Sequence, residues 1–198
     1  MNYSKLLFPL FIVVAAVQLF VPTKMILDRE NILAKGKEFR FKTAPIDPTD
    51  PFRGKYITLN FAERSVKVDS TQEWKRNDKI YVLLEEDGDG FAKIKGVRKN
   101  KPKGQDFVKA KVRYSRKYNH SIDVSFPFRK YYMEESKAYD AERYTRRWRI
   151  NIDSTQNVYA VVRVIDGESV LQNVMVNGKK IEDLVKEKQR EEEDTKTK

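Results

Sequence analysis

The sequence predicts a mainly β protein, an antiparallel β-sandwich or open barrel, preceded by an N-terminal transmembrane helix. Three observations predict this class: an uncharged apolar run near the N-terminus, short segments in which apolar and polar residues alternate, and glycine-containing turns between them. We divide the 198 residues into a membrane anchor (1–30), a β-rich domain (31–185) and a charged tail (186–198).

The apolar run from Leu6 to Val21, LLFPLFIVVAAVQLFV, contains no charged residue. As a helix it would span about 24 Å at a rise of ~1.5 Å per residue, slightly less than a hydrocarbon core of ~30 Å. Residues 25–27 extend the span if the ammonium group of Lys24 reaches the lipid headgroups. Pro22 is expected to end the regular helix, because proline lacks an N–H group.

Two other interpretations of this segment are open. A signal peptide could be cleaved after Val14-Ala15-Ala16, and a buried helix of a soluble domain could also be apolar. The run continues beyond the small residues and has no polar face, so we favour an uncleaved anchor. Lys and Arg are more frequent after the run than before it, which taken alone would place the C-terminal part in the cytoplasm.

Beyond the anchor, short segments alternate in the way that half-buried strands do. Turn sequences separate several of them, notably EEDGDG at 85–90 and IDGES at 165–169, and a third turn, VNGKK at 176–180, opens the last segment. The spacing indicates eight or nine strands in antiparallel sheets. The expected strands are EFRFKTAPI, KYITLNF, KIYVLLE, GFAKIKGV, VKAKVRY, SIDVSFPF, RINID, VYAVVRV and SVLQNVMV.

Two helices are expected within the β-rich domain. The segment Glu134–Arg147 is rich in helix-forming residues, and Ala138 and Ala141 recur on one face. A C-terminal helix follows the turn at 176–180 and packs Ile181 and Leu184 against the domain. The tail beyond it mixes both charge signs without an apolar residue, so we expect it to fray into disorder.

Several kinds of chemistry are excluded or unsupported. The chain has no cysteine, which excludes disulfides and thiolate metal sites, and its single histidine, His120, cannot form an imidazole cluster. No nucleophile elbow, phosphate-binding glycine loop or metal-ligand spacing is found, and EEDGDG lacks the full ligand series of a calcium loop. We therefore predict no catalytic residue, no metal and no cofactor, and we expect no nucleic-acid partner.

The stretch DPTDPFRGKYITLNF, residues 47–61, introduces a strand with two Asp-Pro pairs, which favour turns and extended backbone. Gly54 permits a positive φ or a close backbone approach before the strand. Arg53 presents a planar guanidinium that suits a carboxylate or a phosphate. Arg53 either braces the corner against Asp47 or Asp50, or binds a ligand, and the sequence leaves both readings open.

A basic segment runs from Lys93 to His120 and contains eleven Lys and Arg residues against one Asp. Alternation predicts that Lys109, Lys111 and Arg113 share one face of a strand. Such a face needs no partner, but it would also attract anionic headgroups or an acidic partner. The candidate basic patch comprises Lys99, Lys101, Lys103, Lys109, Lys111 and Arg113.

The segment RGKYITLNF resembles the hallmark of the GDYXXLXY family of bacterial membrane-anchored proteins. Gly54, Tyr56 and Leu59 match the motif, whereas Lys55 replaces its aspartate and Phe61 its final tyrosine. The segments FPFRKYYMEE and NVYAVVRVIDGESVLQNVMVNG are also similar to the family. The resemblance implies a domain outside the cytoplasm (periplasmic) on a single-pass anchor, and we give it more weight than the charge asymmetry. It implies no activity.

Three classes of function remain. The first and favoured class is an accessory or binding protein that works with another envelope or membrane protein, for example a multi-spanning one. The second is an envelope-polymer hydrolase that uses Glu135 and Glu142, although these lie ~10 Å apart along a helix, which is wide for a shared catalytic site. The third is a structural β-domain that binds anionic surface material. The candidate binding residues are Arg53, Gly54, Tyr56, Leu59, Glu135 and Glu142.

Overall fold

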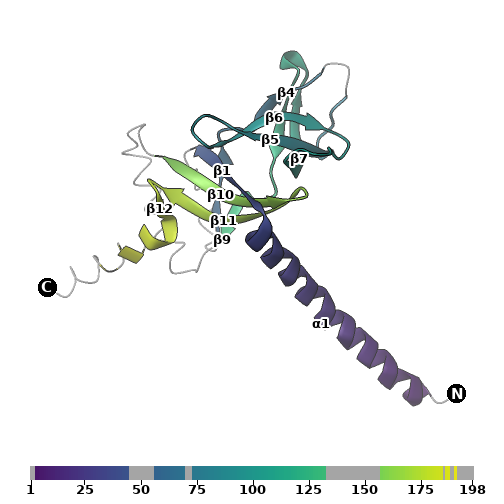
Figure 1. Ribbon diagram of the computed structural model, residues 1–198. Helices are drawn as coiled ribbons and strands as arrows, with labels where there is room; N and C mark the ends of the chain where they lie inside the picture. The colour runs from purple at the N-terminus through teal and green to yellow at the C-terminus, as the bar shows by residue number, and fades with distance from the viewer. Residues whose placement is uncertain are drawn as a thin grey trace.

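The computed structural model describes residues 3–44, 56–69, 73–132, 157–184, 186–187 and 190. Within these ranges the chain forms one long helix, two five-stranded antiparallel sheets and a two-stranded ribbon (Figure 1). A short helical stretch follows at residues 181–184. The mainly β class is confirmed, with helices at both ends. The helix predicted at Glu134–Arg147 and the strand predicted at RINID lie outside the described residues.

Helix α1 runs from Tyr3 to Lys35 and projects from the β-domain as a single rod (Figure 1). Pro9 and Pro22 both lie inside it, so the expected helix end at Pro22 was wrong. Proline removes one N–H donor, but the other backbone bonds of the helix remain. The helix ends instead at Lys35. The N–H group of the next residue, Gly36, donates to the carbonyl of Ile32 at 2.8 Å.

The large apolar side chains of α1 are exposed from Leu7 to Leu27. In the part of the chain that the structure describes, this is the one helix long and apolar enough to cross a membrane. A hydrocarbon environment would cover this surface, and the helix pairs its own backbone groups except where Pro9 and Pro22 lack an N–H group. The helix is therefore suited to a single-pass anchor.

The first sheet has the strand order β12-β11-β10-β1-β3. Its turns at Asp166-Gly167 and Asn177-Gly178 have positive φ at both residues, as two-residue hairpins require. Two of the three turns expected from sequence are therefore confirmed here. The strand bounds are β1 Lys37–Ala44, β3 Asn60–Phe61, β10 Val158–Ile165, β11 Glu168–Val176 and β12 Lys179–Lys180.

The second sheet has the order β4-β8-β7-β5-β6, and its edge strands β4 and β6 approach each other, so that it nearly closes. The turn EEDGDG joins β5 to β6, where a carboxylate oxygen of Asp87 accepts N–H groups from Asp89 and Phe91. A 3-10 turn at Lys117–Asn119 joins β7 to β8. The bounds are β4 Ser65–Lys67, β5 Lys79–Glu86, β6 Ala92–Arg98, β7 Phe107–Arg116 and β8 Ser121–Ser125.

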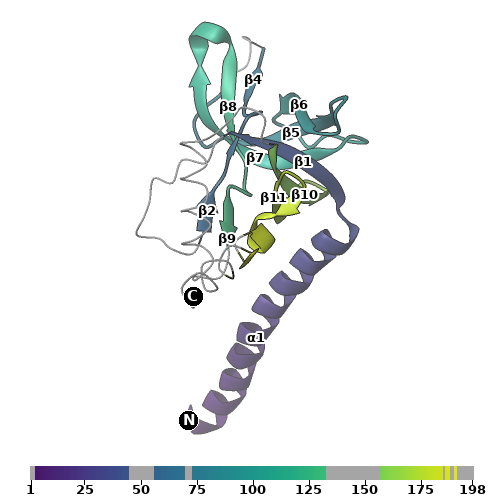
Figure 2. The same cartoon turned by 90° about the vertical axis from the view of Figure 1, so that its left-hand side faces the viewer.

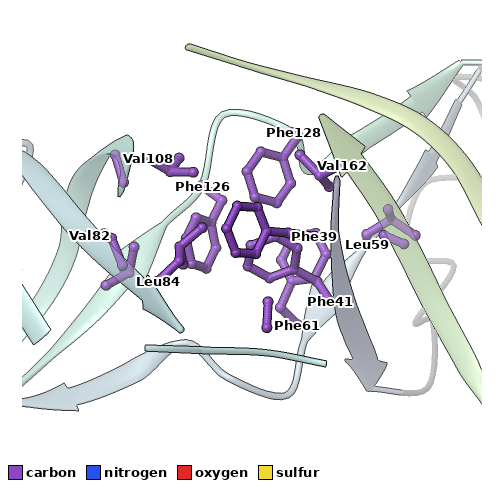
Figure 3. Packing of buried hydrophobic residues seen from close by; sticks show 14 of the residues in the cluster. Phe39, Phe41, Leu59, Phe61, Val82, Leu84, Val108, Phe126, Phe128 and Val162 are labelled. Atoms are coloured by element: carbon purple, nitrogen blue, oxygen red, sulfur yellow. The ribbon is translucent and has the colours of Figure 1, made fainter. Parts of the chain in front are cut away.

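The core lies between the two sheets and is rich in phenylalanine (Figure 3). Phe41 of β1 and Phe61 of β3 meet Phe126 and Phe128, which follow β8, with ring centroids 5.0–5.7 Å apart. Edge-to-face and tilted contacts dominate the cluster, which is the geometry that aromatic quadrupoles favour. The cluster ties both sheets into one body.

The anchor joins the domain without a flexible linker. Ile32 is buried in the domain, and Arg29 donates to the carbonyl of Ser169 at 3.1 Å. At Gly36 an added Cβ would lie 2.5 Å from the Ile32 carbonyl and 3.0 Å from the Val164 nitrogen, so the backbone is too close for a side chain. Arg163 donates to the carbonyl of Gly36 at 3.3 Å. The last turns of α1 are therefore part of the domain.

Candidate functional site

Two segments that carry the sequence motifs lie side by side in the ribbon of β2 (Tyr56–Thr58) and β9 (Lys130–Tyr132). Tyr56 pairs with Tyr132, and the N–H group of Leu59 donates to the carbonyl of Arg129 at 2.7 Å. Segments about seventy residues apart in the chain thus form one structure (Figure 2). Arg53, Gly54, Glu135 and Glu142 lie outside the described residues.

Of the motif residues that the structure describes, Leu59 lies in the hydrophobic core. Leu59 is fully buried, and it separates β2 from β3, so the strand leaves β9 and pairs with β1 at Phe61. Phe61 belongs to the phenylalanine cluster. The motif strand therefore connects the ribbon to the first sheet.

Tyr131 on β9 joins the ribbon to the C-terminal helical stretch. Its hydroxyl donates to a carboxylate oxygen of Glu182 at 2.9 Å. Burial, followed by this hydrogen bond and the negative charge of Glu182, raises the pKa of Tyr131 well above its usual range. The hydroxyl therefore stays protonated and remains a donor. Sequence reasoning missed this pair, because its two residues lie far apart in the chain.

Two members of the basic patch form ion pairs with the β10–β11 turn. Lys101 lies 2.6 Å from a carboxylate oxygen of Asp166, and Lys109 lies 2.7 Å from one of Glu168. The backbone N–H of Lys109 also donates to the carbonyl of Gly167 at 2.9 Å. These bonds raise the pKa of Lys109 and lower that of Asp166. We call this set of contacts the hairpin clamp.

The other patch members have different surroundings. Lys99 donates to the carbonyl of Glu73 at 2.6 Å and lies 5.0 Å above the ring of Trp74. Lys103 lines a hollow of about 740 Å³ at the end of α1, together with Lys35 and Lys37. Within that hollow, Lys37 is neutralised by Asp106 at 2.8 Å.

Lys109 and Lys111 are exposed between buried neighbours, so they share one face of β7 as the alternation predicts. A β-bulge after Val112 leaves Arg113 without a cross-strand partner. The guanidinium of Arg113 lies 5.4 Å above the ring of Tyr114. The six residues of the patch expected from the sequence therefore have different surroundings in the structure.

Sequence reasoning also missed three cations that lie around strands β7 and β8. Lys79 lies directly opposite Lys111 on β5, and Arg64 precedes β4, where its carbonyl accepts the N–H of Val124 at 2.7 Å. Arg129 precedes β9 and is half-buried. No local pattern links these residues, because strand register and chain crossings bring them together.

A mainly β domain carried without a linker on an apolar helix defines the class of the molecule: a protein suited to membrane anchoring, with a β-rich domain beside the membrane. A family model described as GDYXXLXY protein matches residues 18–174. The chain therefore belongs to the GDYXXLXY family, as its motifs predict. No curated protein and no solved structure matches the chain.

Proposed function

We propose that the protein is an extracytoplasmic accessory protein that is anchored in the membrane and binds another membrane or envelope protein. The observation that carries this proposal is the rigid junction between α1 and the domain, formed by Ile32, Arg29 and Gly36. A protein built to reach distant partners would have a flexible linker at this place. A multi-spanning protein in the same membrane is the partner class that the geometry suits best.

The height of the domain supports this partner class. The segment of α1 from Asp28 to Lys35 adds about 12 Å at ~1.5 Å per residue, more than the ~5–8 Å depth of one headgroup layer, so the domain begins just outside the lipid. Because the last turn is fixed to β10 and β11, the domain stays at this height. It can therefore contact the exposed loops of a neighbouring membrane protein.

Partner capture tests the proposal. We expect crosslinking in intact membranes, followed by affinity purification, to recover one stoichiometric partner with the full chain. Insertion of a ten-residue Gly-Ser linker after Lys35 should keep the domain folded but reduce this crosslink strongly, because the domain would no longer be held at one height. A crosslink of equal yield with and without the linker would contradict the role of the rigid junction.

Orientation is tested separately. The family resemblance supports an extracytoplasmic domain, whereas the Lys/Arg asymmetry around the anchor favours the cytoplasm. We expect a reporter that is active only outside the cytoplasm to be active when fused after Lys198. Activity of only the cytoplasmic reporter would overturn the proposed placement.

A further inference from the structure

Five cations lie on or beside strands β4, β5, β7 and β9. They come from four segments of the chain, and we call them the cationic face. Its members are Arg64, Lys79, Lys111, Arg113 and Arg129. Among the residues that the structure describes, none of the five has an ion pair with a carboxylate.

The lysine pair is the first sign of a binding role. Lys79 of β5 and Lys111 of β7 are direct cross-strand partners, and both side chains are exposed. Like charges in this position destabilise a sheet. The next residue on the same face, Lys109, is neutralised by Glu168, so the absence of a partner is local to the cationic face.

The arginines provide a second, independent indication of a binding role. Arg113 lies in the bulge of β7, and bulges commonly redirect a side chain at a functional position. Asp123, the cross-strand partner of the adjacent Tyr114, accepts two bonds from Arg116 at 2.8 and 3.0 Å. It therefore already has a strong partner.

Arg129 lies within electrostatic range of Arg113 and Arg64. Burial first, and then the positive charges of Arg113 and Arg64, lower the pKa of the Arg129 guanidinium. Arginine nevertheless remains charged at neutral pH. These three guanidinium groups have no carboxylate counterion among the described residues.

A hollow of about 470 Å³ lies beside Lys79 and Lys111, and this volume is in the usual range of small-ligand sites. Its walls include Lys79, Lys111 and Ser125, and Ser125 is the cross-strand partner of Lys111. The serine hydroxyl can donate to an anion that the two ammonium groups attract. The sheet therefore supplies both a recess and matching donors.

We propose that the cationic face binds a phosphate-bearing anion. The two ammonium groups at one recess suit a ligand with more than one negative charge, and guanidinium groups match pairs of phosphate oxygens. Its source is either the headgroup of an anionic lipid in the anchoring membrane or a soluble phosphate compound. This site goes beyond the proposed function, since it requires no protein partner.

Calorimetric titration of the full chain in phosphatidylcholine nanodiscs with tripolyphosphate tests the proposal. We expect the double variant Arg113→Gln/Arg129→Gln to lose at least about tenfold in affinity, since a tenfold change corresponds to ~1.4 kcal/mol. The variant Lys180→Gln/Lys186→Gln removes the same charge elsewhere and should lose less than about twofold. Arg113→Lys, which keeps the charge but not the planar fork, should give an intermediate loss with unchanged melting.

Two results would contradict the proposal. If the wild-type protein does not bind tripolyphosphate at low salt, or if both double variants lose affinity equally, the site does not exist. Native mass spectrometry from mixed phosphatidylglycerol and phosphatidylcholine nanodiscs then identifies the source. Retention of phosphatidylglycerol by the wild type, but not by the arginine variant, identifies a lipid headgroup. If the wild type and the arginine variant retain phosphatidylglycerol equally, but only the wild type binds tripolyphosphate, the ligand is a soluble phosphate compound.

Discussion

Lys109 and Lys111 lie two residues apart on the same face of β7, yet their surroundings are opposite. Lys109 meets Glu168 at 2.7 Å, and the hairpin turn of β10–β11 covers that end of the strand. Lys111 faces Lys79 across the sheet and has no carboxylate partner among the described residues. One basic strand therefore divides into a hairpin clamp that stabilises the fold and a cationic face that is available to a ligand.

The comparison of Lys109 with Lys111 shows that alternating lysines on one strand can have different roles. At the clamp, the first sheet supplies Asp166 and Glu168, so the cations join two parts of the same chain. At the cationic face, the neighbouring strands supply further cations. What lies across the strand decides the role, and this depends on register and topology.

The largest expected effect comes from breaking the clamp at its closest contact. A Cβ added at Gly167 would overlap the ring of Phe107, and the backbone there has φ +82°. We expect Gly167→Ala to destabilise the protein by about 2–4 kcal/mol through overpacking and backbone strain. Denaturant unfolding of the full chain measures this change.

Gly178 provides the matched control, because it has the same φ of +82° in a turn but no atom within 4 Å of the added Cβ. Gly178→Ala should cost only the backbone strain, about 1–2 kcal/mol. Equal losses at Gly167 and Gly178 would mean that the contact with Phe107 does not hold the hairpin.

Reversing one charge sharpens the comparison at the other end of the strand. Lys79→Glu places a carboxylate opposite Lys111 and converts repulsion into attraction. We expect a gain in stability of about 0.2–1 kcal/mol, together with a loss of tripolyphosphate binding. Thermal melting and calorimetry on the same preparation test both effects. A stability gain with intact binding would remove Lys111 and Lys79 from the proposed site.

Acid should weaken the clamp before it affects the cationic face. The bond from Lys101 lowers the pKa of Asp166 below its usual value of 3.8, so its contribution is present above that pH. It is lost as pH falls through the lower pKa of the folded state. Asp166→Asn keeps a residue that tolerates positive φ, and its melting temperature should fall less than that of the wild type between about pH 5 and pH 2. Parallel acid curves would contradict a stabilising role for this ion pair.

The sequence predicts the long strands well, because alternation over seven or more residues is specific for a half-buried sheet. It does not predict β4, β9 and β12, which contain only two or three residues each. It also ends the helix too early at Pro22, since tertiary packing of Ile32 against the domain outweighs one missing backbone bond.

The candidate site was predictable only in part. The motif identifies the strand that contains Tyr56 and Leu59, and composition identifies the basic segment. Neither reveals that Lys79 lies opposite Lys111, or that Lys101 and Lys109 are neutralised. These facts depend on which strands are neighbours and in which register, and no local pattern encodes them.

The most direct test of the division between clamp and cationic face compares two single substitutions, Lys109→Gln and Lys111→Gln, by the melting temperature of the full chain without added anion. Lys109→Gln removes the partner of Glu168 and should lower stability by about 0.2–1 kcal/mol. Lys111→Gln relieves repulsion from Lys79 and should raise stability by about the same amount. Opposite signs are the predicted result. A decrease in both variants would contradict the division of β7 into a neutralised end and an end that is free to bind an anion.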